Sequence, residues 1–225
     1  MSAEKATVAP LSAAARRWLA VEMLLIFFAL PGLLIIFRQH LRMMVVPLIV
    51  VGGTLFWNAL SRSTTFDREK FLSRREVGRN VLQILKVFIP AGALMTVATW
   101  CFCRAHFLEF PLQRTGIWML IMIAYPVICV PFQEVIFRGY FFHRYAGLFS
   151  RPWHLLVVNA VSFALCHMFY FNWVAPTLTL AGGFLFAWRY QRTGSLWAVA
   201  IEHGLWGDLL FTVGLGIYLF SGNIK

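Results

Sequence analysis

The residues of this sequence that could do chemistry are ionisable groups inside apolar segments of its C-terminal half. Glu134 and Arg138 stand four residues apart, so a helix would place them on one face with the acid N-terminal, which favours an ion pair. His167 lies 33 residues beyond Glu134, and His203 lies 36 residues beyond His167, each in a separate apolar run. Charged groups are costly in an apolar environment and usually mark function where they occur.

A glutamate and two histidines form a set that can activate water. Glu134 would act as the base, His167 would orient or polarise the water, and His203 would meet the negative charge that develops on the attacked oxygen. The same three groups could instead bind a divalent metal such as zinc, although their separations are too long for a local zinc loop. The plainer interpretation is a structural salt bridge and two hydrogen-bonded core histidines. Chemistry requires that three distant helices bring the groups together.

The composition predicts that these helices cross a membrane. Hydrophobic residues make up 60% of the 225 residues, charged residues make up 13%, and the mean hydropathy is +0.72. A soluble domain is nearer 45–50% apolar and about 25% charged, so this balance excludes a disordered chain and argues against a water-soluble globule. We therefore predict an all-α polytopic bundle of about seven to eight transmembrane helices. The net charge of +11 comes from basic residues between apolar runs, as expected for loops that face membrane lipid and not nucleic acid.

The apolar runs divide the chain into a tail and two groups of spans. Residues 1–17 are predicted to be a cytoplasmic tail, 18–110 the N-terminal spans with a basic loop at 61–80, and 111–225 the catalytic core. Since basic loops face the cytoplasm, the loop and the N-terminus are both placed there. The final run is too long for one upright span, and it would be tilted or broken near Gly204 or Gly207. The predicted spans are residues 18–37, 43–60, 81–102, 117–132, 133–149, 153–171, 174–190 and 195–220.

Three short motifs, in order, resemble the signature of the CAAX-protease and bacteriocin-processing (CPBP, or Abi) intramembrane endopeptidases. They are Gln133-Glu134 with Arg138, Phe163 with His167, and His203 with Asp208, and the similar region covers about residues 115–220. The usual form of the signature is E-E-x-x-x-R, F-x-x-x-H, and H-x-x-x-N or D. The resemblance implies a bundle of about eight helices with a cavity that opens inside the bilayer of a bacterial inner membrane.

The same resemblance implies what the site does. The substrate would be a membrane-associated peptide or protein, for example one with a CAAX end, a bacteriocin or pheromone, or a C-terminal sorting tag. Glu134 and His167 would activate water and His203 would stabilise the oxyanion, with Gln133, Arg138 and Asp208 in support. Members have been treated both as metalloproteases and as glutamate-dependent proteases, so a zinc ion held by the three main residues is the other option.

The sequence departs from the family pattern at two positions. Gln133 stands where the first acid is expected, and it cannot accept a proton usefully, so either Glu134 is the base or activity is lost. Neighbouring helical residues differ by about 100°, so Glu134 could replace it only through a helix rotation or a local distortion. The fourth residue after His203 is Gly207, and Asp208 would reach the site only through a kink or a π-bulge. Glu202 is the other polar neighbour of His203.

Two other functions are compatible with these residues. A non-catalytic family member would keep the cavity as a binding or scaffolding site, which the departures at Gln133 and Gly207 would explain. A small transporter or channel would use the buried acid and histidines as a proton relay. The ordered set of motifs favours the peptidase over both.

Overall fold

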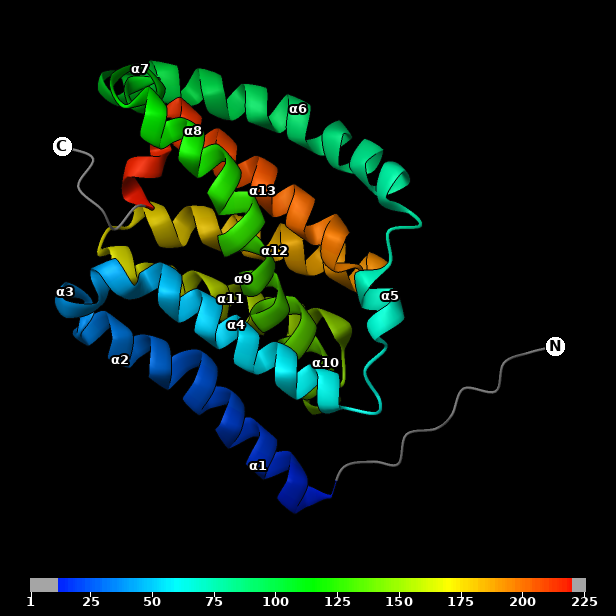
Figure 1. The fold of residues 1–225 in the computed structure, drawn as a ribbon. Helices are drawn as coiled ribbons and strands as arrows, with labels where there is room; N and C mark the ends of the chain where they lie inside the picture. The colour runs from blue at the N-terminus through cyan, green and yellow to red at the C-terminus, as the bar shows by residue number, and fades with distance from the viewer. Residues whose placement is uncertain (1–11, 220–225) are drawn as a thin grey trace.

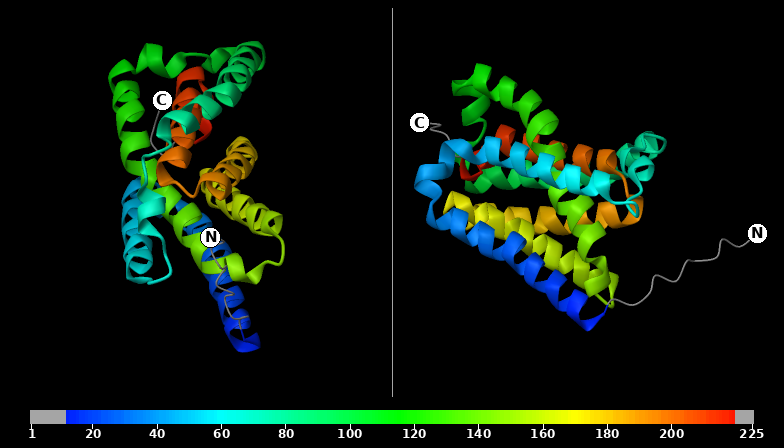
Figure 2. Two further views of the ribbon diagram at one scale, coloured as in Figure 1. Left: turned by 90° about the vertical axis from the view of Figure 1, so that its right-hand side faces the viewer. Right: turned by 60° about the horizontal axis from the view of Figure 1, so that its bottom comes forward.

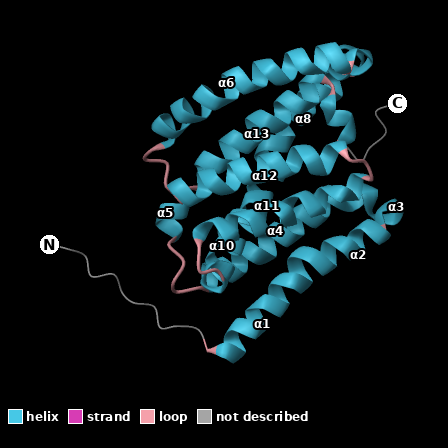
Figure 3. Ribbon diagram, turned by 180° about the vertical axis from the view of Figure 1, so that it is seen from behind, coloured by secondary structure: helices cyan, strands magenta, loops and turns pink. Residues whose placement is uncertain are grey.

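The computed structural model describes residues 12–219, and within that range every regular element is a helix (Figures 1 and 3). Five of these helices are long and apolar enough to cross a membrane, namely Ala13–Ile36, Arg38–Arg62, Val77–Phe102, Thr115–Leu148 and Pro152–Tyr170. The predicted all-α membrane bundle is therefore confirmed. The long helices run back and forth between two ends of the molecule (Figure 2).

The N-terminal part of the chain makes two long helical passes. The first pass consists of α1 (Ala13–Leu24), a π-helical segment η1 (Leu25–Ala29) and α2 (Leu30–Ile36), and the short α3 (Arg38–Leu41) and the 3-10 turn η2 (Arg42–Met44) lead into α4 (Val45–Arg62). Ser12 caps α1 by accepting a hydrogen bond from the backbone N–H of Ala15. The helix thus begins inside the predicted tail of residues 1–17, of which residues 1–11 lie outside the described range.

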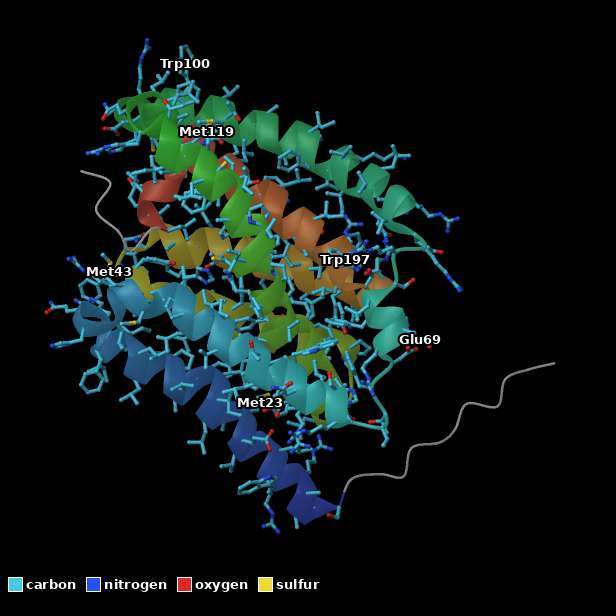
Figure 4. All side chains as sticks on the ribbon, viewed as in Figure 1. Met23, Met43, Glu69, Trp100, Met119 and Trp197 are labelled. Atoms are coloured by element: carbon cyan, nitrogen blue, oxygen red, sulfur yellow. The ribbon has the colours of Figure 1, made fainter. Side chains whose placement is uncertain are left out.

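The basic loop and the third long helix follow. The predicted loop at 61–80 contains α5 (Arg68–Leu72), which Asp67 caps through a hydrogen bond from the N–H of Lys70 at 2.9 Å. It leads into α6 (Val77–Phe102), and η3 (Arg104–His106) and α7 (Glu109–Gln113) make the next turn. Figure 4 shows Glu69 of α5 and Trp197 near the start of the last long helix at one end of the bundle, with Trp100 of α6 at the other.

One continuous helix replaces the two spans that were predicted at residues 117–132 and 133–149, so that division was wrong. It comprises α8 (Thr115–Ala124), η4 (Tyr125–Cys129), α9 (Val130–Glu134), η5 (Val135–Tyr140), α10 (Phe141–Tyr145) and η6 (Ala146–Leu148). Both η4 and η5 are π-helical. Pro126 and Pro131 lack backbone N–H groups, and a helix accommodates such residues by local widening instead of ending. The polar residues of the first motif therefore lie at the middle of a long helix, at the junction of α9 and η5.

The last three helices carry the other two motifs. They are α11 (Pro152–His167), followed by η7 (Met168–Tyr170), then α12 (Val174–Thr193) and α13 (Leu196–Val213), followed by η8 (Leu215–Tyr218). The helix α13 runs through Gly204 and Gly207 without a break, and it ends at Gly214, whose φ of 105° suits a residue without a side chain. Of the two alternatives predicted for this run, a break near Gly204 or Gly207 does not occur.

Side-chain contacts join the start of α1, the basic loop and the end of the long helix at one end of the bundle. The guanidinium of Arg16 donates to the carbonyl oxygen of Leu148 at 2.7 Å, and Ser63 hydrogen-bonds His143 at 2.9 Å. The start of α1 and the loop 61–80 therefore lie on the same side of the bundle, as expected with two spans between them. Between the two ends, an aromatic cluster that includes Phe27, Phe141 and Phe163 fills the core.

Candidate active site

The first and third motifs meet in one buried hydrogen-bond network. The carboxylate of Glu134 accepts a hydrogen bond from Arg138 Nη1 at 3.2 Å, which forms the predicted ion pair, and both side chains are fully buried. The same oxygen, Oε1, lies 2.6 Å from Nδ1 of His203 on α13. A carboxylate at this distance fixes the orientation of the imidazole and its Nδ1 proton. Two residues that are 69 positions apart thus form one unit.

The other ring nitrogen of His203 contacts a residue that the motifs do not contain. Its Nε2 lies 2.9 Å from the hydroxyl of Tyr125, the first residue of η4. The ring of Phe186 stacks on the imidazole with centroids 4.5 Å apart. Sequence reasoning did not identify Tyr125, because its partner is 78 residues away and a tyrosine in an apolar run resembles many core tyrosines.

His167 ends α11 and does not contact Glu134 or His203 through any hydrogen bond described. Its Nδ1 lies 2.8 Å from the backbone oxygen of Phe163, which can only accept, so Nδ1 carries the proton. The other nitrogen, Nε2, is therefore an acceptor when the ring is neutral, as a general base requires. The Phe163 ring lies between the two histidines, with centroids 4.6 Å from His167 and 5.6 Å from His203.

Both histidines line one cavity of about 420 Å³. Most of its wall is apolar, and helices from both halves of the chain build it: Phe27, Leu34 and Phe56 come from the N-terminal spans. The polar wall residues include Tyr125, Gln133, His167 and His203, and no Asp or Glu of the described chain is among the lining residues. The histidines therefore present the imidazole groups that a molecule in this cavity would meet, beside the weaker acids Tyr125, Tyr170 and Cys166.

Gln133 and Glu134 face different surroundings, as neighbouring helical residues must. Gln133 lines the cavity, whereas Glu134 is fully buried against Arg138 and His203 and is absent from the lining. The guanidinium of Arg138 also packs over the ring of Phe163 at 4.6 Å, and its Nη2 lies 3.4 Å from the oxygen of Gly183. The role of Glu134 as the base stays a prediction, and this geometry instead favours an action through His203.

The two acidic neighbours of the third motif lie away from His203. Glu202 is fully buried in a two-point ion pair with Arg189 of α12, at 2.8 and 2.9 Å. Asp208 makes no side-chain hydrogen bond in the described structure, and its Oδ1 is buried without a partner. No π-helical segment interrupts α13 near Asp208, because the α-helix is continuous from Leu196 to Val213, so the distortion that Asp208 would need to reach the site is not there. No side-chain hydrogen bond in the described structure therefore supports the role predicted for Asp208.

A buried amide supports the distorted part of the long helix. Asn159 of α11 donates from Nδ2 to the backbone oxygen of Phe137 in η5, at 2.7 Å. A π-helical segment disturbs the regular backbone ladder, so a buried carbonyl there needs an outside donor. Asn159 thereby holds the segment that carries Arg138. An asparagine inside an apolar helix is the only sequence signal that could have pointed to it.

The residues present do not fit a divalent metal ion. Within residues 12–219 no group of three or more His, Cys, Asp or Glu side chains is placed to hold one. Both nitrogens of His203 already have partners, and the Glu134 carboxylate is paired with a cation. A zinc site needs three protein ligands that converge with free lone pairs. Glu134, His167 and His203 do not offer this arrangement.

These features define the class of protein: a helical membrane protein with a largely apolar cavity between its helices, into which two histidines face. Residues 114–207 match the family model described as Rce1-like, type II CAAX prenyl endopeptidase. The matched segment is less than half of the chain, but it contains all of the first two motifs and His203. The resemblance to the CPBP family is thereby confirmed over this segment, and it supports protease activity in general. No curated protein and no solved structure matches the chain.

Proposed function

We propose that this protein is an intramembrane endopeptidase that hydrolyses a peptide bond in a membrane-associated peptide or protein, of which a CAAX-type C-terminus is the first to test. The observation that carries the proposal is that both motif histidines line a single, largely apolar cavity among the spans. An apolar wall with a few polar groups suits a segment of substrate that is itself apolar. The protein would lie in a bacterial inner membrane with its N-terminus and the loop 61–80 in the cytoplasm.

In this proposal the base is His167. No carboxylate lines the cavity among the described residues, and His167 Nε2 is free to accept a proton. A water molecule oriented by Gln133 forms a bond to the carbonyl carbon while its proton passes to Nε2. The proton then goes to the amine nitrogen as the carbon–nitrogen bond breaks. The negative charge on the carbonyl oxygen develops on the His203 side of the cavity, while Glu134 and Arg138 position His203, and no step needs a bound metal.

Replacing His167 tests this mechanism. The His167→Gln variant should cleave about 100-fold to 10,000-fold more slowly than the wild type, which is the usual contribution of a general base. The assay uses a quenched fluorescent, farnesylated CAAX peptide with the purified full chain in liposomes. The matched control is His154→Gln on the same helix, because His154 is not among the cavity-lining residues. Full activity in His167→Gln, or an equal loss in the control, would overturn the mechanism.

A second candidate, peptide binding without hydrolysis, has one observation in its favour. Gln133 lines the cavity where the family pattern has an acid, and Glu134 is closed off behind it. Under this alternative the wild type and His167→Gln would bind the farnesylated peptide equally well, as fluorescence anisotropy would measure, and mass spectrometry would detect no product from either. Product formation by the wild type alone would reject it.

A further inference from the structure

The absence of a side chain at Gly207 and the presence of Tyr125 are linked. A Cβ atom added at Gly207 would overlap the ring of Tyr125 and fall 2.7 Å from its hydroxyl oxygen. Any other residue at position 207 therefore conflicts with Tyr125 where it stands. Position 207 is one helical turn beyond His203, and the hydroxyl of Tyr125 fills the space that a polar side chain from this position would occupy.

The hydroxyl of Tyr125 also stands over the outward nitrogen of His203. Because a carboxylate only accepts hydrogen bonds, Nδ1 of His203 donates to Glu134, and Nε2 is left to Tyr125 at 2.9 Å. When Nε2 has no proton, the phenol donates to it. When Nε2 carries a proton, the ring donates to the phenol oxygen, and the phenol hydrogen is free to turn to a third group.

The surroundings hold this phenol in place at the cavity wall. Tyr125 lines the cavity, and its ring packs edge-on against Phe211 with centroids 5.4 Å apart and against His203 at 6.0 Å. The imidazole itself is only 4% exposed. A substrate carbonyl would therefore reach the phenol oxygen more easily than the ring nitrogen behind it.

We infer that Tyr125 is a further catalytic residue: its hydroxyl accepts a hydrogen bond from protonated Nε2 of His203 and donates its own hydrogen to the substrate carbonyl oxygen as that oxygen becomes negative. This inference rests on the proposed peptidase function. A donor fixed in advance at the site of developing charge is the usual means of stabilising an oxyanion. Two hydrogen bonds, between Glu134 and His203 and between His203 and Tyr125, then connect the buried ion pair to the substrate.

The Tyr125→Phe variant removes only the hydroxyl. With the farnesylated peptide in liposomes, we expect kcat to fall about 100-fold, the usual effect of losing one oxyanion donor, with KM and Tm little changed. The matched control is Tyr190→Phe, because Tyr190 lies outside the cavity lining. An unchanged kcat in Tyr125→Phe, or an equal loss in Tyr190→Phe, would overturn the inference.

A binding measurement separates this inference from the proposed function. An aldehyde in place of the scissile amide of the same peptide hydrates to a tetrahedral form, and its affinity is read by thermal shift without any turnover. Weaker binding to Tyr125→Phe than to the wild type supports the hydroxyl contact even if the wild type cleaves nothing, an outcome that would reject the peptidase alone. Equal binding would reject the contact even if the wild type cleaves.

A glycine pair tests the same contact without changing the tyrosine. Gly207→Ala should displace the Tyr125 ring and reproduce the losses in kcat and aldehyde affinity. Gly116→Ala, in α8, which directly precedes the segment of Tyr125, adds the same methyl where no atom lies within 4 Å and should leave both unchanged. Wild-type kcat and affinity in Gly207→Ala would contradict the inference.

Discussion

Glu202 and His203 are neighbours in α13, and each contacts a different buried arginine–glutamate pair: Glu202 pairs with Arg189, and His203 contacts the Glu134 that pairs with Arg138. The two pairs differ in how completely their polar atoms are hydrogen-bonded. Arg189 and Glu202 face each other with two short hydrogen bonds, at 2.8 and 2.9 Å, which is the fork geometry that guanidinium and carboxylate groups prefer. In the pair of Arg138 and Glu134, a single carboxylate oxygen serves both the arginine and His203.

The second pair leaves atoms without hydrogen bonds. Oε2 of Glu134 and Nε of Arg138 lie 3.2 Å apart, yet both lack a properly aligned partner in the described structure. Buried polar groups are normally satisfied, and exceptions often coincide with function. The comparison indicates that the Arg189–Glu202 pair serves to bury two charges, whereas the Arg138–Glu134 pair gives up part of its bonding to orient His203 beside the cavity.

The sharpest way to break this comparison is to neutralise each acid in turn. Glu134→Gln should lower cleavage of the farnesylated peptide by about 100-fold or more per folded molecule, because a neutral amide replaces the carboxylate that accepts from Nδ1 of His203 and orients the ring. Glu202→Gln should leave that rate unchanged. Each variant leaves one arginine buried without its charge partner, so each should lose about 3–5 kcal/mol of unfolding free energy in detergent. Equal rate losses in the two variants would refute the distinction.

The sequence predicted one of these pairs and could not have predicted the other. Glu134 and Arg138 are four residues apart on one helix, so their contact follows from helix geometry alone. Arg189 and Glu202 come from different helices, and their contact depends on how α12 and α13 pack. The all-α bundle was equally predictable, because a run of about 20 apolar residues allows few other structures.

The parts that sequence reasoning missed are those that depend on local helix distortion. The two π-helical segments at Tyr125–Cys129 and Val135–Tyr140 merge two predicted spans into one helix. Pro126 and Pro131 predict a disturbed helix, but proline alone does not determine whether the helix ends or continues with a π-helical segment. The distance from Tyr125 to Gly207 along the chain likewise hid their contact. The sequence showed only that Gly207 stands where the family motif has a polar residue, not that Tyr125 occupies the space.

Replacing both members of each pair by apolar residues sharpens the comparison with a smaller effect. Glu202→Leu with Arg189→Met should restore unfolding stability to near the wild-type value and keep cleavage, because well-packed apolar residues often replace a buried ion pair at little cost. Glu134→Leu with Arg138→Met should remain about 1–3 kcal/mol less stable, since Nδ1 of His203 is left buried without an acceptor. It should also stay inactive. Chemical unfolding and the peptide assay measure both, and cleavage by the second double variant would contradict the positioning role.

The smallest expected effects concern the amide side chain that accompanies each pair. Asn159→Ala removes the 2.7 Å hydrogen bond to the carbonyl of Phe137 in the π-helical segment of Arg138, and it should cost about 1–3 kcal/mol because that carbonyl stays buried. Gln83 is exposed and lies 3.5 Å from Arg189, so Gln83→Ala should cost less than about 0.5 kcal/mol. Thermal unfolding in detergent compares the two. Equal losses of unfolding free energy in the two variants would mean that the π-helical segment does not depend on Asn159. The two ion pairs would then depend equally little on their neighbouring amides.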